Sequence, residues 1–270
     1  MATQFDLFRI SVVATRRPSL FATVEEKDSY MEKIFSQNWQ FEHRKTTFDY
    51  VYIKNSHQRI IARIGRARLI EYHSAPERGF EREQMPAWQA STLVIDPTDH
   101  ADGHKLGFEV NPQIGNGFSI LKSMIRHINN LIDSPFELEI NPINNPGTFF
   151  SFVEKSESPI SYLSITFTPP NGLWTAGSSA REEVKQIVNN TGATKVKTTV
   201  SNPNGLDTSS NGLKDAVDYA ESGSGSIKAR TVSGTKYNSD ASQKSAIVSG
   251  ESAEVHQNVM INPQQALGQN

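Results

Sequence analysis

Cysteine is absent from the 270 residues of this chain, and its absence excludes disulfide bonds and thiolate metal ligands. A strong net charge is also absent, because 27 lysines and arginines nearly balance 29 aspartates and glutamates. The chain as a whole therefore has no general attraction to nucleic acid or to a membrane surface.

Long apolar runs are missing as well. No window approaches roughly 18 uninterrupted apolar residues, so we expect no membrane-spanning helix. The first residues contain an early acid, Asp6, and no apolar stretch, so we expect no secretory signal peptide. Together with the missing cysteine, these features favour a cytoplasmic protein that has no membrane partner.

The composition divides the chain into three regions. Residues 43–73 contain seven lysines and arginines against two acids, whereas residues 76–160 contain twelve acids against six bases. Serine, glycine, asparagine and glutamine dominate from about residue 223 onward. We therefore expect a β-rich N-terminal region over residues 1–75, an α+β core over residues 76–235, and a polar, partly mobile segment over residues 236–270.

A short internal repeat indicates the fold class. The tetrapeptide Pro-Asn-Gly-Leu begins at Pro170 and again 33 residues later at Pro203. A strand-like run precedes each copy, and a serine-rich stretch and a helical pattern follow it, over residues 179–189 and 210–221. Residues 119–132 form the clearest amphipathic helix. These patterns predict an α+β, or mixed α/β, protein with antiparallel or mixed sheets, amphipathic helices and two strand–turn–helix repeats.

The basic segment is the strongest indication of a binding surface. Arginine makes strong contacts with phosphate. The tyrosines interleaved with these arginines and lysines can stack on unpaired nucleobases. A second, smaller basic cluster lies near residues 228–244. The alternative is a solvated strand face whose charges pair with the acidic middle of the chain. The candidate nucleic-acid contacts are Lys54, Arg59, Arg63, Arg66, Arg68, Lys228 and Arg230.

A loop over residues 96–104 packs three aspartates and two histidines into nine residues. Carboxylate and imidazole are both good metal ligands, so Asp99, His100, Asp102 and His104 are candidates for one divalent ion. Their spacing matches no standard metal motif, and the alternative is a solvated connection between two strands. We favour the solvated connection and expect no cofactor.

The order of features resembles that of bacterial and prophage proteins of the phage-exclusion RexA and anti-phage KwaB kind. The resemblance covers roughly residues 45–235 and is one of layout. It rests on Trp88, residues 93–97, 106–110, 119–132, 136–142 and 165–171, and a late strand ending near Arg230. It implies a soluble α+β protein that binds DNA or senses a phage product, and it assigns a role to no particular residue.

The leading hypothesis for function is therefore non-enzymatic binding of DNA or RNA in phage defence or phage exclusion. A metal-dependent nuclease or hydrolase that uses the Asp/His loop is an alternative from a different class. A third is an assembly subunit whose polar surfaces meet a protein partner or a second copy of the chain.

Overall fold

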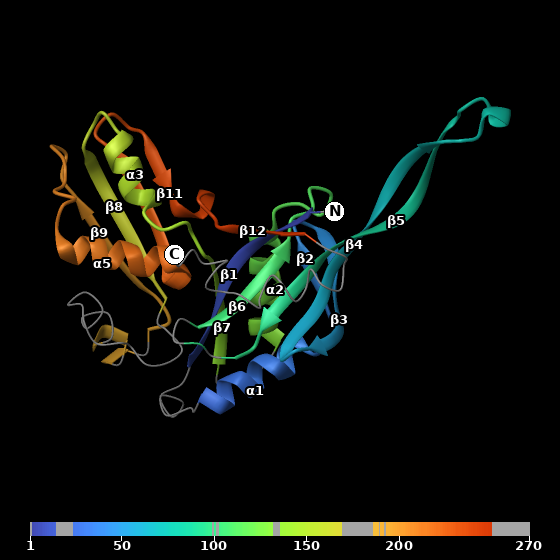
Figure 1. Ribbon diagram of the computed structural model, residues 1–270, viewed down its shortest axis with the longest axis horizontal. Helices are drawn as coiled ribbons and strands as arrows, with labels where there is room; N and C mark the ends of the chain where they lie inside the picture. The colour runs from blue at the N-terminus through green and yellow to red at the C-terminus, as the bar shows by residue number, and fades with distance from the viewer. Residues whose placement is uncertain are drawn as a thin grey trace.

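The computed structural model describes residues 2–14, 24–98, 100, 103–131, 136–168, 186–188, 190–191 and 193–249 (Figure 1). The described part of the chain is mostly β, with 49% strand and 27% helix, and its main sheet is a curled antiparallel half-barrel. The predicted α+β class with amphipathic helices is therefore wrong. Every pairing between the named strands is antiparallel, which also excludes mixed sheets for these strands.

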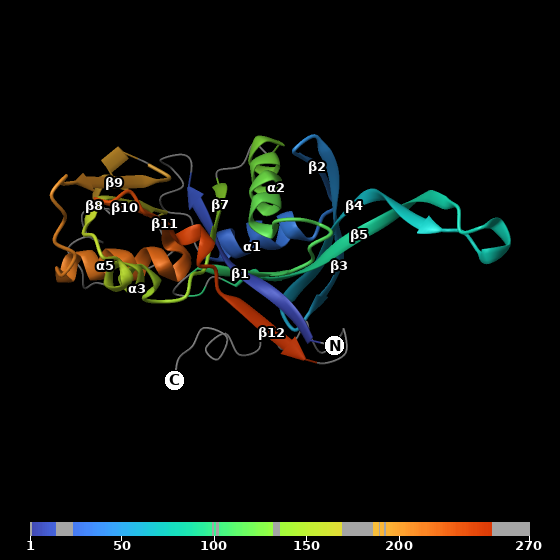
Figure 2. The same cartoon turned by 90° about the horizontal axis from the view of Figure 1, so that it is seen from above.

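An eight-stranded sheet forms the large lobe together with two helices. Its order is β12-β1-β6-β5-β4-β3-β2, and β7 also pairs with β1. The strands are β1 (Ala2–Ala14), β2 (Trp39–His43), β3 (Thr46–Ser56), β4 (Arg59–His73), β5 (Arg82–Asp96), β6 (His104–Glu109), β7 (Phe136–Pro142) and β12 (Ser245–Ser249). The helices α1 (Val24–Phe35) and α2 (Gly117–Leu131) lie on the same side of this sheet (Figure 2).

In the core of the large lobe, alternate side chains of the strands pack against the apolar stripe of a helix. In β4, Ile60, Ala62 and Ile64 are buried and point towards the helices. The apolar stripe of α2 is buried against them, as the sequence predicts for this helix, and it comprises Ile120, Leu121, Met124, Ile125 and Ile128. We call this helix-covered side of the sheet its inner face and the opposite side its outer face.

A four-stranded sheet forms the small lobe, with the order β11-β10-β8-β9. Its strands are β8 (Ile160–Phe167), β9 (Val196–Ser201), β10 (Gly225–Thr231) and β11 (Lys236–Asn238). The helices α3 (Thr148–Lys155) and α5 (Asn211–Tyr219) lie on one side of this sheet (Figure 2). There they enclose a second core around Phe149, Leu163, Ile165, Val217 and Ile227.

The two lobes are joined by polar contacts of the helical turn η3 (Ala220–Ser224). Its Glu221 carboxylate accepts hydrogen bonds at the start of α3 within the small lobe. Across the junction, the Arg9 guanidinium from β1 donates to Ser224 Oγ at 2.8 Å. Gly223 has a φ of 91°, and a Cβ there would lie 3.0 Å from atoms of Arg9 and Ile143. The junction therefore requires glycine at this position.

The hairpin of β4 and β5 extends beyond the rest of the sheet as a two-stranded arm (Figure 1). We define the arm as residues 66–89. The two strands stay paired from Ile60 opposite Ile95 to His73 opposite Arg82, and the tip contains the short helix η2 (Pro76–Arg78). The sequence predicts a bend at Gly65, but the strand is continuous there. A Cβ on Gly65 would lie 3.0 Å from the Gln89 carbonyl oxygen, so glycine at this position allows β4 and β5 to approach closely.

Only the second copy of the repeat can be compared with the structure. The first tetrapeptide, from Pro170, lies outside the described residues, as does most of the predicted helix over residues 179–189. In the second copy, Ser210 caps α5 by accepting a hydrogen bond from Leu213 N at 3.3 Å, and Leu206 packs against the core of the small lobe. Among the described residues, no helix has the length and apolar character needed to cross a membrane.

Candidate nucleic-acid interface

Within the basic segment, the Arg59 side chain makes its contacts inside the fold. Its guanidinium lies 3.3 Å from the buried carboxylate of Asp96 and donates to the His57 carbonyl at 3.0 Å. Because a buried carboxylate needs a positive partner, this ion pair has a structural role.

The remaining members of the basic segment do not form one cluster. Arg63 is exposed on the outer face of β4, whereas Arg66 and Arg68 lie on its other face, because successive side chains of a strand alternate. The Arg66 guanidinium lies 5.5 Å from the centre of the Phe48 ring and donates to the Gln113 carbonyl at 2.9 Å. Lys54 is exposed on the neighbouring strand β3. The segment is continuous in sequence but divided in space.

Lys228 and Arg230, in contrast, share one face with other bases. Both are exposed on β10, on the side of the sheet opposite its core. Arg230 is paired with Lys236 of β11 on one side and with Tyr162 of β8 on the other. Lys228 precedes Arg230 by two residues in β10 and therefore lies about 7 Å from it on the same face. Lys197 of β9 is opposite Thr166 and completes the set. We call Tyr162, Lys197, Lys228, Arg230 and Lys236 the basic sheet face.

The strands that form this face contain no acid. Residues 160–167, 196–201, 225–231 and 236–238 include four lysines and arginines but neither aspartate nor glutamate. All four bases are exposed on the same side. Sequence reasoning missed Tyr162 and Lys197, because no stretch of sequence brings them near Lys228. The lack of acids over the four strands is the signal that relates them.

The basic sheet face carries a shallow cavity of about 350 Å³ lined by Tyr162, Lys228, Arg230 and Lys236. The Arg230 guanidinium lies 6.0 Å from the centre of the Tyr162 ring, which holds the charge beside an aromatic surface. A flat ring flanked by positive charges can stack on a base and contact its phosphates at the same time.

The edge of the basic sheet face reaches the large lobe. Lys122 of α2 lies with its Nζ 4.2 Å from the centre of the Phe118 ring. Burial lowers the pKa of Lys122, and the positive charges of Lys195 and Lys228 add to this effect, whereas the carboxylates of Asp240 and Glu139 oppose it. Lys195 in turn forms an ion pair with Glu139 of β7 at 2.7 Å. At the junction of the two lobes, the positive charges are therefore partly balanced by Glu139 and Asp240.

The Asp/His loop is divided between the two faces of the large sheet. His100 Nε2 lies 3.0 Å from the Asp96 carboxylate, beside Arg59 on the outer face. His104 is fully buried on the inner face, where burial lowers its pKa to about 4. Asp99 and Asp102 lie outside the described residues. Within the described residues, no group of three or more acids and histidines is arranged to hold a metal ion.

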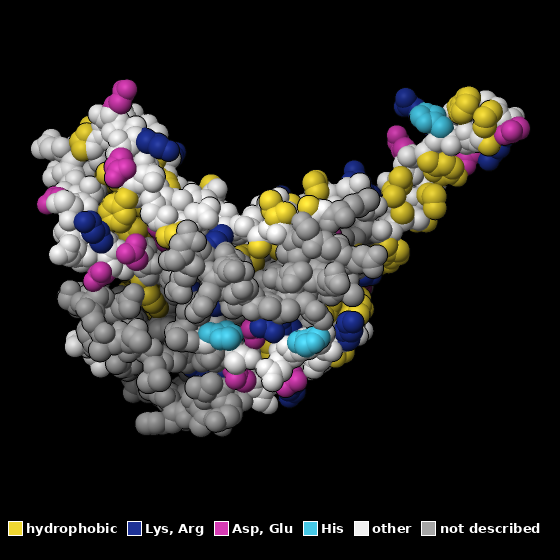
Figure 3. Space-filling view, in the orientation of Figure 1, with side chains coloured by type: hydrophobic (Ala, Val, Ile, Leu, Met, Phe, Trp, Pro, Cys, Tyr) yellow, Lys and Arg dark blue, Asp and Glu magenta, His cyan; other side chains and the backbone are white. Residues whose placement is uncertain are grey.

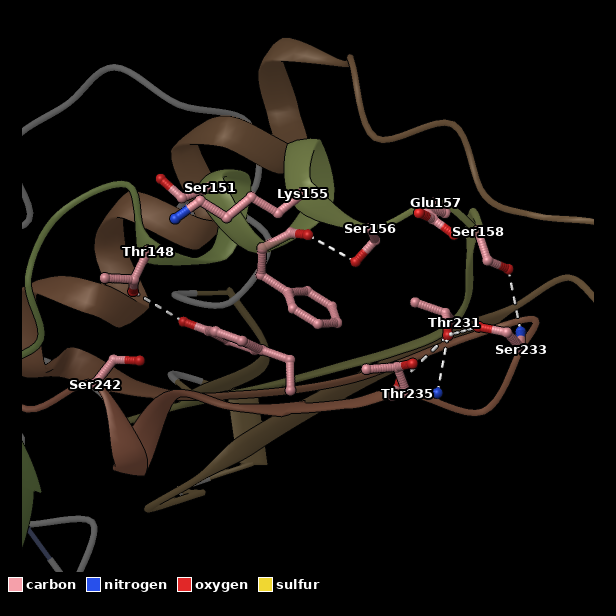
Figure 4. Close-up of a pocket in the computed structure, with 12 residues that line it drawn as sticks. Thr148, Ser151, Lys155, Ser156, Glu157, Ser158, Thr231, Ser233, Thr235 and Ser242 are labelled. Carbon is pink, nitrogen blue, oxygen red and sulfur yellow. Dashed lines mark hydrogen bonds between the residues drawn. The ribbon is translucent and has the colours of Figure 1, made fainter.

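A cavity of about 660 Å³ lies beside α3 and is lined by nine hydroxyl side chains and Lys155 (Figure 4). Several of these hydroxyls bond within the fold. Thr148 Oγ1 lies 2.9 Å from the Tyr237 hydroxyl, Ser156 donates to the Phe152 carbonyl at 2.7 Å, and Ser158 Oγ accepts from Ser233 N at 3.1 Å. These contacts stabilise the small lobe, and the basic sheet face is the better candidate site.

Comparison with known proteins gives no match: no family model, no curated protein and no solved structure matches this chain. The resemblance in layout to phage-exclusion proteins therefore stays a prediction.

Proposed function

We propose that this protein binds single-stranded nucleic acid through the basic sheet face, in phage defence or phage exclusion. The observation that carries the proposal is the grouping of Lys228, Arg230 and Lys236 around Tyr162, with Lys197 on the same face, on strands without acids. Exposed lysines and arginines beside a partly exposed aromatic ring are typical of surfaces that contact a phosphate backbone and stack on the nucleotide bases. The phage setting is supported by the layout resemblance alone.

Salt dependence is the quantitative test of phosphate contacts. Each contact with a single strand contributes about 0.7 to the slope of log affinity against log salt, so four contacts give a slope of about −3. We expect binding of a labelled mixed-sequence oligonucleotide to weaken about 50-fold between about 50 and 200 mM salt. The double variant Lys228→Ala/Arg230→Ala should bind more weakly and lose only about sevenfold over the same range.

The matched control is Lys54→Ala/Arg68→Ala, which removes two exposed bases from the large lobe. It should bind like the wild type, because neither residue belongs to the basic sheet face. Tyr162→Ala should weaken binding by about 1–3 kcal/mol through lost stacking, and Tyr162→Phe should restore it. If the Lys228→Ala/Arg230→Ala variant bound as tightly as the wild type at every salt concentration, the basic sheet face would not be the site.

Two further arms of the experiment separate the alternatives. Adding magnesium or manganese and looking for cleavage tests the nuclease hypothesis, because a metal-dependent nuclease would shorten the oligonucleotide. Plating of phages on cells that produce the wild type or the Lys228→Ala/Arg230→Ala variant tests the biological setting. Equal plating on both would reject a role of the basic sheet face in phage exclusion.

A further inference from the structure

The arm exposes several large apolar side chains, although it is a β-hairpin that projects from the rest of the sheet. Leu69 is 61% exposed and Trp88 is 66% exposed, and Phe80 at the tip is 60% exposed. Hydrophobic side chains run along the arm in Figure 3. An isolated two-stranded hairpin is at best marginally stable in water, so a long one is expected to gain stability by packing against something.

Strand register assigns each side chain of the arm to one of two faces, because residues directly opposite in an antiparallel pair point the same way. Trp88 is opposite Ala67, and Pro86 is opposite Leu69. The other residues on this face are also exposed, with Gln84 opposite Glu71 towards the tip. Towards the large sheet the same face continues to Gly65 opposite Ala90 and to Arg63 opposite Thr92. We call this outer side of the hairpin its apolar face.

The apolar face is self-complementary about its centre at Ala67 and Trp88. Two residues along β4 towards the tip lies the large Leu69, and two residues towards the body lies Gly65, which has no side chain. Four residues towards the tip lies the negative Glu71, and four residues towards the body lies the positive Arg63. On β5, Pro86 and the small Ala90 flank Trp88 in the same way.

We propose that two copies of this chain dimerise through the apolar faces of their arms, packed face to face and antiparallel. The two-fold axis lies between the two faces and runs perpendicular to the strands, passing over Ala67 and Trp88. It places Leu69 of one copy over Gly65 of the other. The same axis sets Glu71 of each copy opposite Arg63 of the other, and the two Trp88 rings meet at the centre. Large side chains cover small ones, and opposite charges meet at both ends.

The charge pair makes the proposal testable without ambiguity. Within one chain, Arg63 and Glu71 lie eight residues apart on one strand, about 27 Å, so they cannot pair with each other. Arg63→Glu and Glu71→Arg should each weaken dimerisation by about tenfold or more, because each places like charges opposite one another. The double variant Arg63→Glu/Glu71→Arg should return to within about threefold of the wild type, because the opposite charges then meet again across the interface.

The assay is the mass of the full chain by analytical ultracentrifugation over a dilution series. The wild type should show twice the 30.0 kDa of one chain at high concentration. Arg68→Glu is the matched control, since it reverses a charge on the opposite face of the same strand and should leave dimerisation unchanged. Circular dichroism reports whether each variant is folded, and a second disrupting variant, Trp88→Ser, removes the central ring without changing charge.

Two results would overturn the proposal. A monomeric mass for the wild type at every concentration that the protein tolerates would leave the arm for some other partner. A double variant no better than either single reversal, or an Arg68→Glu variant as impaired as Arg63→Glu, would show that the apolar face is not the interface.

Discussion

The substitution Glu221→Gln removes one buried negative charge from the junction of the two lobes while leaving the side chain nearly the same size. The carboxylate is 2% exposed and accepts three hydrogen bonds at the start of α3. Its Oε2 accepts from Gly147 N at 2.7 Å, and its Oε1 accepts from Thr148 Oγ1 and Phe149 N, both at 2.8 Å. Backbone N–H groups at a helix start have no partner within the helix, so Glu221 acts as the cap of α3.

The cost of Glu221→Gln follows from these contacts. The amide oxygen can still accept from Thr148 and Phe149, but the amide nitrogen brings its own hydrogens towards the Gly147 N–H. One hydrogen bond to a charged group is lost, at about 1.5–3 kcal/mol, and the favourable interaction of a negative charge with the helix dipole adds about 0.3–1 kcal/mol. We expect the free energy of unfolding to fall by about 2–4 kcal/mol.

Urea unfolding at neutral pH, followed by circular dichroism, measures this free energy. Glu157→Gln is the control, because Glu157 is an exposed acid just after the same helix and its substitution should change stability by less than about 0.5 kcal/mol. A Glu221→Gln protein within about 0.5 kcal/mol of the wild type would refute the reasoning, since it would mean that the start of α3 is held by something other than this carboxylate.

Two more predictions concern buried groups. The pKa of His104 is lowered from 6.5 to about 4 in the folded protein, chiefly by burial, so the unfolded chain binds this proton more readily. The stability that depends on neutral His104 should therefore be complete above pH 6.5 and decrease by about 3 kcal/mol as the pH falls to 4. Urea unfolding of His104→Leu should lack this part of the pH dependence, and equal slopes in both proteins would contradict it. Gly225→Ala should lower the free energy of unfolding by about 3 kcal/mol, because the new Cβ would lie 2.1 Å from the Thr166 carbonyl oxygen. Gly212→Ala in α5 is the control: its Cβ meets no atom within 4 Å, so the free energy of unfolding should rise by about 0.5–1 kcal/mol.

The parts of the fold that bury one face could be predicted from the sequence. The stripe from Ile120 to Ile128 repeats with the period of a helix, and α2 forms there because that stripe must be covered. The arm could not be predicted in this way. Its residues are exposed on both faces of the hairpin, so the run over residues 82–90 shows no alternation of apolar and polar side chains. The α+β prediction failed in part because this long strand was not recognised.

Of the candidate site, the sequence predicted Lys228 and Arg230 but not Tyr162 or Lys197, for a related reason. A cluster of charges in sequence becomes a cluster in space on a helix face or a loop, but a strand sends neighbouring residues to opposite sides. Arg63 and Arg66 differ by three positions, an odd number, and therefore lie on opposite faces of β4. Tyr162, Lys197 and Lys228 are far apart in sequence and come together only because β8 pairs with both β9 and β10.

The two proposals depend on different residues in different lobes, and each can fail without the other. Arg63→Glu changes the arm of the large lobe and leaves Lys228 and Arg230 in place, whereas Lys228→Ala/Arg230→Ala changes the small lobe and leaves the arm intact. If both proposals hold, the dimer carries two basic sheet faces on one particle. A single-stranded nucleic acid long enough to reach both basic sheet faces then binds the second face in an intramolecular step. The affinity of the dimer for that nucleic acid rises without any new kind of contact. The arm would thereby influence nucleic-acid binding although it touches no nucleic acid.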